Sequence, residues 1–236
     1  MHLRLIWLAS ACYGVLLFIL VTKIPETQYT LDRNALRLKH LMHSYGKQFS
    51  NVMLISGGFL MGSATSYIYL FAAVVPFIAM KLLGMSSAEY GLANIFPAIG
   101  LVLGLITAAQ LAKHYSLAAI MRSGILIAST GAVFMLLAAW LHLSAINTLF
   151  LPMLIIYFGL SWVLGNASTL AMSAVSDKAH GSAVMNFINM GFATTMVISL
   201  KMFSITLWVL PMVYIALCLI MLTFYGCAML SKQMSS

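Results

Sequence analysis

The side chains that could bind a ligand in this 236-residue chain are uncharged and few. Amides, hydroxyls and phenols form hydrogen bonds with a small molecule, but they supply no strong acid or base. A polar group inside an apolar segment must find a partner, because leaving it unpaired in hydrocarbon costs several kcal/mol. We therefore predict substrate-binding candidates at Ser66, Tyr67, Tyr69, Asn94, Asn166, Asn186 and Asn189.

Asn166 is the sharpest of these candidates, since a primary amide has four hydrogen-bonding positions to satisfy. It lies in the string Gly165, Asn166, Ala167, toward one end of an apolar segment. An amide that joins two helices explains it as well as an amide that contacts substrate. Tyr67 and Tyr69 are two positions apart, which is about 200° on a helix, so they do not both face one cavity.

Residues for covalent or metal chemistry are missing from the sequence. It contains no nucleophile with a nearby base, no HExxH zinc motif and no phosphate-binding glycine loop. The three cysteines fall within apolar segments, where a thiol behaves as a small apolar group, and their spacing suits neither a disulfide framework nor a metal. We predict that the protein is not an enzyme and uses no cofactor or metal.

The acidic residues avoid the apolar segments. All four lie between these segments or at their edges: Glu26, Asp32, Glu89 and Asp177. Proton coupling needs a group that titrates at accessible pH, and buried carboxylates usually provide it in membrane proteins. Proton-driven transport by this polypeptide alone is therefore poorly supported.

Seven apolar stretches position the candidate residues, and each is long enough to cross a bilayer, which takes about 20 residues as a helix. The predicted spans are Leu5–Ile24, Ser50–Met80, Tyr90–Leu111, Arg122–Leu141, Thr148–Ser173, Gly181–Phe203 and Leu207–Leu230. Hydrophobic residues make up 63% of the chain and charged residues 7%, against about a quarter charged in soluble domains. The fold class is thus an all-α membrane protein with about seven transmembrane helices, the first too long for a cleaved signal.

Basic residues predict the orientation. Nine fall in connections that would share one side of the membrane: Lys23, Arg33, Arg37, Lys39, Lys47, Lys113, Arg122, Lys178 and Lys232. Arg4, Lys81 and Lys201 would lie on the other side. The positive-inside rule then places the amino terminus outside and the carboxyl terminus in the cytoplasm, in a multi-pass protein of the cell inner membrane. The net charge of +8 is scattered over short loops, which argues against nucleic acid as a partner.

The longest connection divides the chain. We predict a single transmembrane helix at 1–24, a cytoplasmic basic linker at 25–49 and a six-helix unit at 50–236. Basic residues of the linker could contact anionic lipid heads, at about 1 kcal/mol each, or could serve only to orient the chain. Within the spans, Gly58 with Gly62 and Gly100 with Gly104 have the GxxxG spacing of close helix packing.

Short strings along the chain match a known family in order and in interval. They are Pro25-Glu26-Thr27, Pro76-Phe77-Ile78 with Gly84, Tyr90-Gly91, Arg122-Ser123-Gly124, Gly165-Asn166-Ala167 and Gly181-Ser182-Ala183. In these strings the chain resembles the carboxyl-terminal half of major facilitator superfamily transporters, most closely the bicyclomycin-resistance (Bcr/CflA) type of drug/proton antiporter. Val75, Gly165 and Pro97 depart from the family pattern, which leaves substrate selectivity open.

The resemblance covers helices six to twelve of the family and implies one helix followed by a half-bundle. It implies a transporter of drugs or other small molecules, present as a truncated or split half and partnered by a missing amino-terminal half, with membrane lipid around it. One alternative is a self-contained homodimer whose GxxxG faces build a shared pathway. Another is a seven-span receptor, which is disfavoured because the span Leu207–Leu230 has no lysine for a retinal Schiff base.

Overall fold

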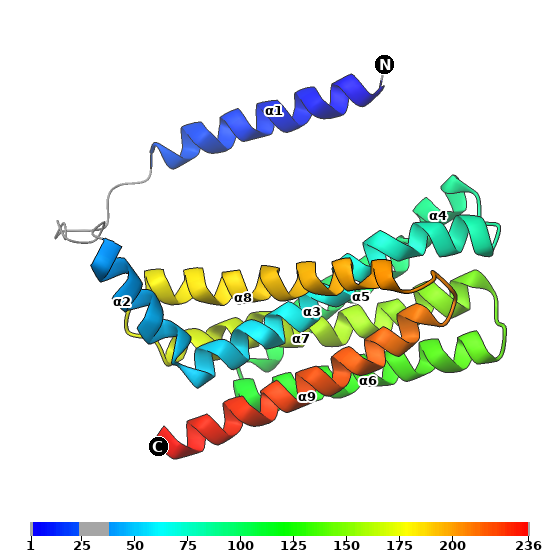
Figure 1. Cartoon of the computed structure of the whole chain (residues 1–236). Helices are drawn as coiled ribbons and strands as arrows, with labels where there is room; N and C mark the ends of the chain where they lie inside the picture. The colour runs from blue at the N-terminus through cyan, green and yellow to red at the C-terminus, as the bar shows by residue number, and fades with distance from the viewer. Residues whose placement is uncertain (1, 24–37, 236) are drawn as a thin grey trace. The chain divides into compact units, whose positions relative to one another are not determined.

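The computed structural model describes residues 2–23 and 38–235, and all regular elements within these ranges are helical. The chain divides into two compact units, residues 1–41 and 42–236. In the first unit, α1 (His2–Val21) is a 20-residue helix that corresponds to the first predicted span (Figure 1). Its apolar side chains, such as Trp7 and Phe18, are exposed. Its insertion in the membrane stays a prediction, and predicted linker residues 25–37 lie outside the described ranges.

The second unit is a bundle of long apolar helices. The main helices are α3 (Val52–Phe77), α5 (Ile95–Leu111), α6 (Leu117–Trp140), α7 (Leu151–Ser173), α8 (Lys178–Ser199) and α9 (Val209–Ser235). Shorter elements extend or join them: η1 (Ile78–Leu82), α4 (Ser87–Ala93), η2 (Ile146–Phe150) and η3 (Leu200–Met202). Six helical stretches in the described ranges are long and apolar enough to cross a membrane, and they correspond to predicted spans two to seven. The prediction of an all-α membrane protein is confirmed.

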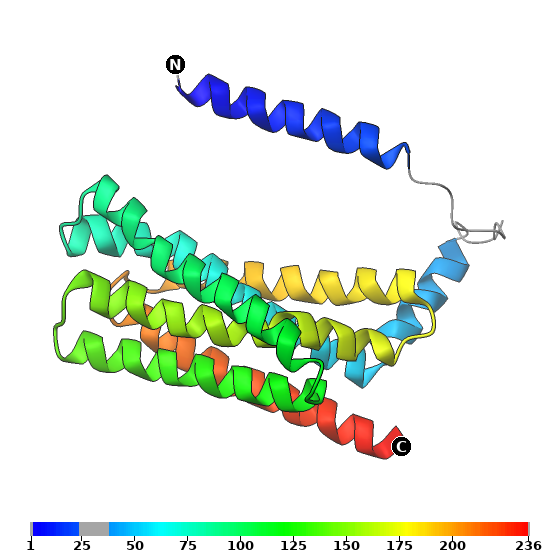
Figure 2. The same ribbon diagram turned by 180° about the vertical axis from the view of Figure 1, so that it is seen from behind.

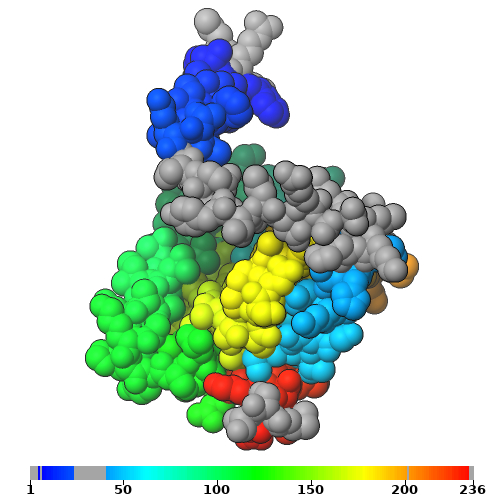
Figure 3. Space-filling view, turned by 90° about the vertical axis from the view of Figure 1, so that its left-hand side faces the viewer, coloured from blue at the N-terminus to red at the C-terminus, as the bar shows by residue number. Residues whose placement is uncertain are grey.

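Helix α2 (Leu38–Phe49) lies where the sequence analysis expected only a basic linker. Its apolar residues recur at helical spacing, as at Met42, Tyr45 and Phe49, and polar residues lie between them. The Tyr45 ring packs edge-on against His180 at 5.0 Å between centroids, and Phe49 against Phe187 at 6.3 Å. In the space-filling view α2 in blue and α8 in yellow are neighbours at this end of the bundle (Figure 3). Because this pairing depends on α8, the local sequence does not reveal it.

Polar residues immediately before the helices define where several of them begin. The Asn51 side chain accepts a hydrogen bond from Leu54 N at 3.1 Å and caps α3, while its amide donates to Ala174 O at 3.0 Å. Ser86 and Glu89 form a reciprocal capping box at the start of α4. Ser116 caps α6 in the same manner as Asn51 caps α3. These caps satisfy backbone N–H groups that have no partner within their own helix.

The bundle has a ring of four helices with one helix added to each of two members. The ring runs from α3 to α9, then to α6 and α7, and the contact of α7 with α3 closes it. Helix α8 packs chiefly on α3, and α5 packs chiefly on α7 (Figures 1 and 2). Burial is greatest in α3 and α7, where 61% of an 18-residue window of each span is buried. The corresponding value is 44% for α6, 28% for α8 and α9, and 22% for the α4–α5 span.

The main contacts of this pattern are preserved when three pairs of helices are exchanged: α3 with α7, α5 with α8, and α6 with α9. The exchange converts the α3–α8 contact into the α7–α5 contact, and the α3–α9 contact into the α7–α6 contact. The α3–α7 and α6–α9 contacts are each converted into themselves. The chain traverses the bundle three times, in α3, α5 and α6, before α7 begins. Each helix of the first triplet therefore runs in the opposite direction to its counterpart in the second.

Glycines lie where helices approach most closely. A Cβ atom on Gly58 or Gly62 of α3 would come within 3.0 Å of Ile188 or Phe192 of α8. On α5, a Cβ on Gly100 would lie 2.2 Å from the Leu154 carbonyl oxygen of α7. At Gly104 the corresponding Cβ would lie 2.6 Å from the Phe158 carbonyl oxygen and 2.8 Å from Ser161. Small residues therefore let backbones meet at both the α3–α8 and the α5–α7 contacts.

Candidate functional site

Five of the seven predicted substrate-binding residues belong to α3 or α8, whose contact we name the α3–α8 seam. They are Ser66, Tyr67, Tyr69, Asn186 and Asn189. The Ser66 hydroxyl is buried and donates to Gly62 O of its own helix at 2.6 Å. Ser63 donates to Phe59 O at 2.8 Å in the same way. These intrahelical bonds satisfy the serine donors and leave the hydroxyl oxygens as possible acceptors.

Asn189 is the unusual residue of the seam. Its side chain is 3% exposed, and its Oδ1 atom has no hydrogen-bond partner in the part of the chain that the structure describes. A buried amide carbonyl without a donor is costly, so its presence calls for an explanation such as a ligand or a water molecule. Asn186, one turn before, is exposed and donates to Ser182 O at 3.0 Å. The seam therefore contains a buried acceptor for which the described residues supply no donor.

A groove follows the seam toward the end of the bundle that carries η1. It has a volume of about 440 Å³, and its lining residues come from both helices: Tyr69, Ala72, Ala73, Thr194, Val197 and Ile198. Tyr69 is 42% exposed, and its hydroxyl has only a weak sulfur contact, 3.7 Å to Met190 Sδ. The groove is thus apolar, with a phenol hydroxyl at its edge that can still donate a stronger hydrogen bond.

Tyr67 points away from this groove and joins α3 to α9. Its hydroxyl donates to Tyr214 O at 2.6 Å and lies 2.8 Å from Cys218 Sγ, while the Tyr214 hydroxyl donates to Tyr67 O at 3.0 Å. Both rings are fully buried, with centroids 4.5 Å apart. The opposite directions of Tyr67 and Tyr69 agree with their angular separation of about 200° on a helix.

The other two predicted asparagines lie apart from the seam. Asn94, at the junction of α4 and α5, donates to Tyr90 O at 2.9 Å. Asn166 of α7 is 8% exposed and donates to Trp162 O at 2.7 Å, within its own helix. The Asn166 amide therefore forms a bond along its own helix, where the sequence analysis considered a bond between helices or a bond to substrate.

Besides the Tyr67 bond between α3 and α9, further interhelical hydrogen bonds come from residues of α7 and α9. The Ser161 hydroxyl donates to Leu101 O at 3.1 Å, and Trp162 Nε1 donates to Thr107 Oγ1 at 2.9 Å, both between α7 and α5. Tyr225 of α9 donates to Ala118 O of α6 at 3.1 Å. Interhelical bonds in membranes contribute about 0.6 to 1.7 kcal/mol each. Only the pairing of helices identifies these residues, since serine, threonine and tryptophan also occur where they contact nothing.

One ion pair lies at the start of α8. Asp177 Oδ1 accepts a hydrogen bond from His180 N at 3.2 Å, and Asp177 Oδ2 lies 2.7 Å from His180 Nδ1. Slight burial raises the pKa of the Asp177 carboxyl, but hydrogen bonds from His180 and Ala179 lower it, and the net result is a pKa below its ordinary value. This carboxylate caps a helix at the surface and stays ionised near neutral pH. Among residues 2–23 and 38–235 no three His, Cys, Asp or Glu side chains gather as metal ligands would.

Comparison with known proteins gives no information about the function of this chain. No family model matches the chain, and a search of curated proteins finds no match either. The features available for a functional argument are therefore the paired triplets of helices, the α3–α8 seam and the cavities at the two ends of the bundle.

Proposed function

We propose that this chain is one half of a membrane transporter for small molecules, of the major facilitator type that its sequence resembles. The observation that carries the proposal is the exchange of α3, α5 and α6 with α7, α8 and α9 in the contact pattern. Two triplets that run in opposite directions and make equivalent contacts form an inverted repeat. Nested inverted repeats of three helices build each half of major facilitator transporters, where substrate binds at the interface of the halves.

A half-bundle of this kind needs a second six-helix unit, because alternating access requires one unit to move against the other. An amino-terminal half or a second copy of the chain would provide it. Helices α5 and α8 are the natural surface for the second unit, since they are apolar, flank the buried helices α3 and α7, and themselves have only 22% and 28% of their span windows buried.

The α3–α8 seam is the substrate surface that we favour. Its groove is lined by apolar and hydroxyl side chains and by no ionisable group other than the Tyr69 phenol. The Tyr69 hydroxyl at the edge of the groove would serve as a donor. Asn189 Oδ1, which is buried in the seam outside the groove lining, would serve as the acceptor that the substrate reaches from the groove. A largely apolar molecule with one N–H or O–H donor fits this surface, and efflux of drug-like compounds is the activity that suits such a substrate best. Coupling to an ion would then depend on residues of the second unit.

Transport can be tested by deleting the gene from cells that carry it and measuring accumulation of the fluorescent dye ethidium. We expect accumulation to rise on deletion and to return to its original level when the gene is restored. Restoration with Asn189→Leu should give about two- to tenfold less efflux, because the loss of one hydrogen bond removes about 0.5 to 1.5 kcal/mol. The same substitution should leave the fold at least as stable, since it removes an unpaired buried oxygen.

Asn147→Leu is the matched control, since Asn147 is exposed in η2, away from the seam. It should restore efflux fully. Unchanged accumulation of ethidium and of an uncharged dye after deletion would count against the transporter. Proteoliposomes with the purified chain alone separate the two sources of the second unit: efflux there indicates a second copy, and its absence together with activity in cells indicates another polypeptide segment.

We also propose that the end of the bundle bearing α2, the α5–α6 and α7–α8 connections and the carboxyl terminus faces the cytoplasm of the inner membrane. Lys47, Lys113 and Lys178 gather there, whereas Lys81 lies at the opposite end. In a variant without native cysteines, Lys81→Cys should react with an impermeant maleimide in intact cells, and Lys47→Cys only after permeabilisation. The reverse labelling pattern would refute this orientation.

A further inference from the structure

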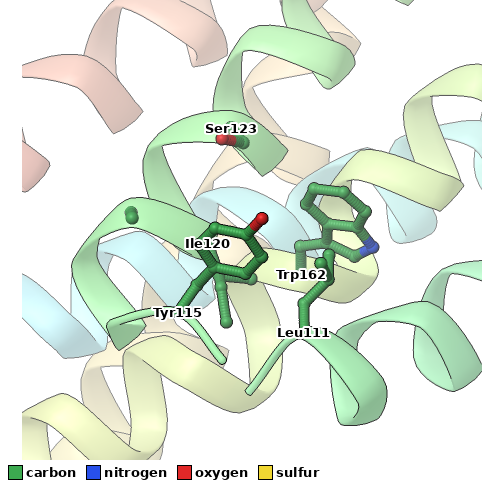
Figure 4. Close-up of a pocket in the computed structure, with 6 residues that line it drawn as sticks. Leu111, Tyr115, Ile120, Ser123 and Trp162 are labelled. Carbon is green, nitrogen blue, oxygen red and sulfur yellow. The ribbon is translucent and has the colours of Figure 1, made fainter. Parts of the chain in front are cut away.

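Two adjoining cavities lie at the basic end of the bundle, beside the connection from α5 to α6. The first, of about 170 Å³, is lined by Leu111, Tyr115, Ala119, Ile120, Ser123 and Trp162 (Figure 4). The second, of about 600 Å³, is lined by Thr107, Gln110, Leu111, Lys113, His114 and Trp162. Because Leu111 and Trp162 line both, we treat them as one pocket with two compartments and name it the α5–α6 pocket.

The contacts between helices explain why a pocket forms here. Helices α5 and α6 both pack on α7 but make little contact with each other. Their separation leaves a furrow, and Trp162 of α7 forms its floor. The indole is held in place, since its Nε1 donates to Thr107 Oγ1 at 2.9 Å. The furrow is therefore a built surface with a fixed aromatic floor, and it extends from the apolar part of the helices to the polar loop that joins them.

The two compartments differ in chemistry. The first is largely apolar, and its Tyr115 hydroxyl points toward the side on which Ser123 and Trp162 lie (Figure 4). The second has Lys113 and His114 at its margin, and neither compartment has a carboxylate in its lining. Neither Lys113 nor His114 forms an ion pair within the described ranges. An apolar slot beside a cationic margin complements a molecule with a hydrocarbon chain and an anionic head.

We propose that the α5–α6 pocket binds one anionic phospholipid, with its phosphate near Lys113 and His114 and an acyl chain along Leu111, Ile120 and Trp162. Three features favour a lipid. The lining within the helices is mostly apolar, the basic groups lie at the polar end of the helices, and Tyr115, which is 61% exposed, sits at the boundary where amphipathic aromatic side chains meet head groups. Basic pockets between helices on the cytoplasmic side are suited to such head groups. The site is independent of the proposed transport activity.

Fluorescence quenching of Trp162 tests the proposal directly. The variant Trp7→Phe, Trp140→Phe, Trp208→Phe of the full chain keeps Trp162 as its one indole, and is placed in phosphatidylcholine bilayers. One tenth of the lipid is replaced by phosphatidylglycerol brominated on its acyl chains or, in the parallel sample, by phosphatidylcholine brominated in the same positions. We expect stronger quenching by the anionic lipid, with roughly fivefold enrichment at the pocket, as about 1 kcal/mol for one basic contact predicts.

Replacing both basic residues, Lys113→Ala with His114→Ala, should abolish the difference between the two brominated lipids. Lys47→Ala removes an exposed basic residue from the same end but outside the pocket, and should leave the difference unchanged. Equal quenching by the two lipids in the parent protein would overturn the proposal, and so would an equal loss in both variants. If the parent shows no preference but octyl phosphate added to the brominated-phosphatidylcholine sample changes Trp162 fluorescence, the ligand is a free amphipathic anion and the lipid proposal is wrong.

Discussion

Gly100→Ala is expected to lower the free energy of unfolding of the bundle by about 3 kcal/mol, the upper part of the range for overpacking. The added Cβ would lie 2.2 Å from the Leu154 carbonyl oxygen and 3.0 Å from Leu154 Cα, so α5 cannot keep its place on α7. The obstacle is backbone, which cannot rotate away as a flexible side chain does. Unfolding of the purified protein by sodium dodecyl sulfate in mixed micelles, followed by circular dichroism, measures the change.

Two further alanine variants calibrate this result. Gly165→Ala is the control, because nothing lies within 4 Å of its added Cβ, and alanine favours a helix over glycine by up to about 1 kcal/mol. Gly58→Ala should fall between the two, since its Cβ meets Ile188 side-chain atoms at 3.0 Å and 3.1 Å. If all three variants unfold at the same detergent fraction, the close α5–α7 contact described above is incorrect.

Tyr67→Ala should destabilise the bundle by about 3 to 5 kcal/mol, the cost of truncating a large buried aromatic side chain. The substitution removes a ring that packs on Tyr214 and leaves a cavity between α3 and α9. It also removes the hydrogen bond to Tyr214 O. Tyr67→Phe keeps the ring and loses only the hydroxyl, so its expected loss is about 0.6 to 1.7 kcal/mol. The same detergent titration measures both.

Tyr69→Ala provides the matched comparison two positions along the same helix. Because Tyr69 is half-exposed and its hydroxyl has only a weak sulfur contact, we expect a loss below about 1 kcal/mol. A Tyr69→Ala loss as large as that of Tyr67→Ala would contradict the assignment of Tyr67 to the α3–α9 contact. For a direct effect on efflux we expect the opposite order, with the larger effect from Tyr69→Ala, since Tyr69 lines the groove of the α3–α8 seam and Tyr67 does not.

The sequence alone was sufficient to predict the six long apolar helices of the second unit. Hydropathy over about 20 residues is a local property, and a segment in lipid must satisfy its backbone within itself, so helix is the outcome. The same local reasoning gave the opposite directions of Tyr67 and Tyr69, because residue spacing alone determines angles around a helix. Helix α2 was not predicted. It is short and only partly apolar, and its aromatic residues are explained by α8, which follows more than 100 positions later.

The tertiary structure determines which helix each helix face packs against. The GxxxG spacing marks Gly58, Gly62, Gly100 and Gly104 alike, but it does not say that the first two meet α8 and the last two meet α7. Nor does it show that Asn166 bonds within its own helix while Asn189 Oδ1 has no partner among the described residues. Side-chain type and spacing are local, whereas the neighbour of each face depends on packing summed over all six helices. From its residues alone the chain is determined to be an all-α membrane protein; only the pairing of its helices brings out the inverted repeat, the seam and the pocket.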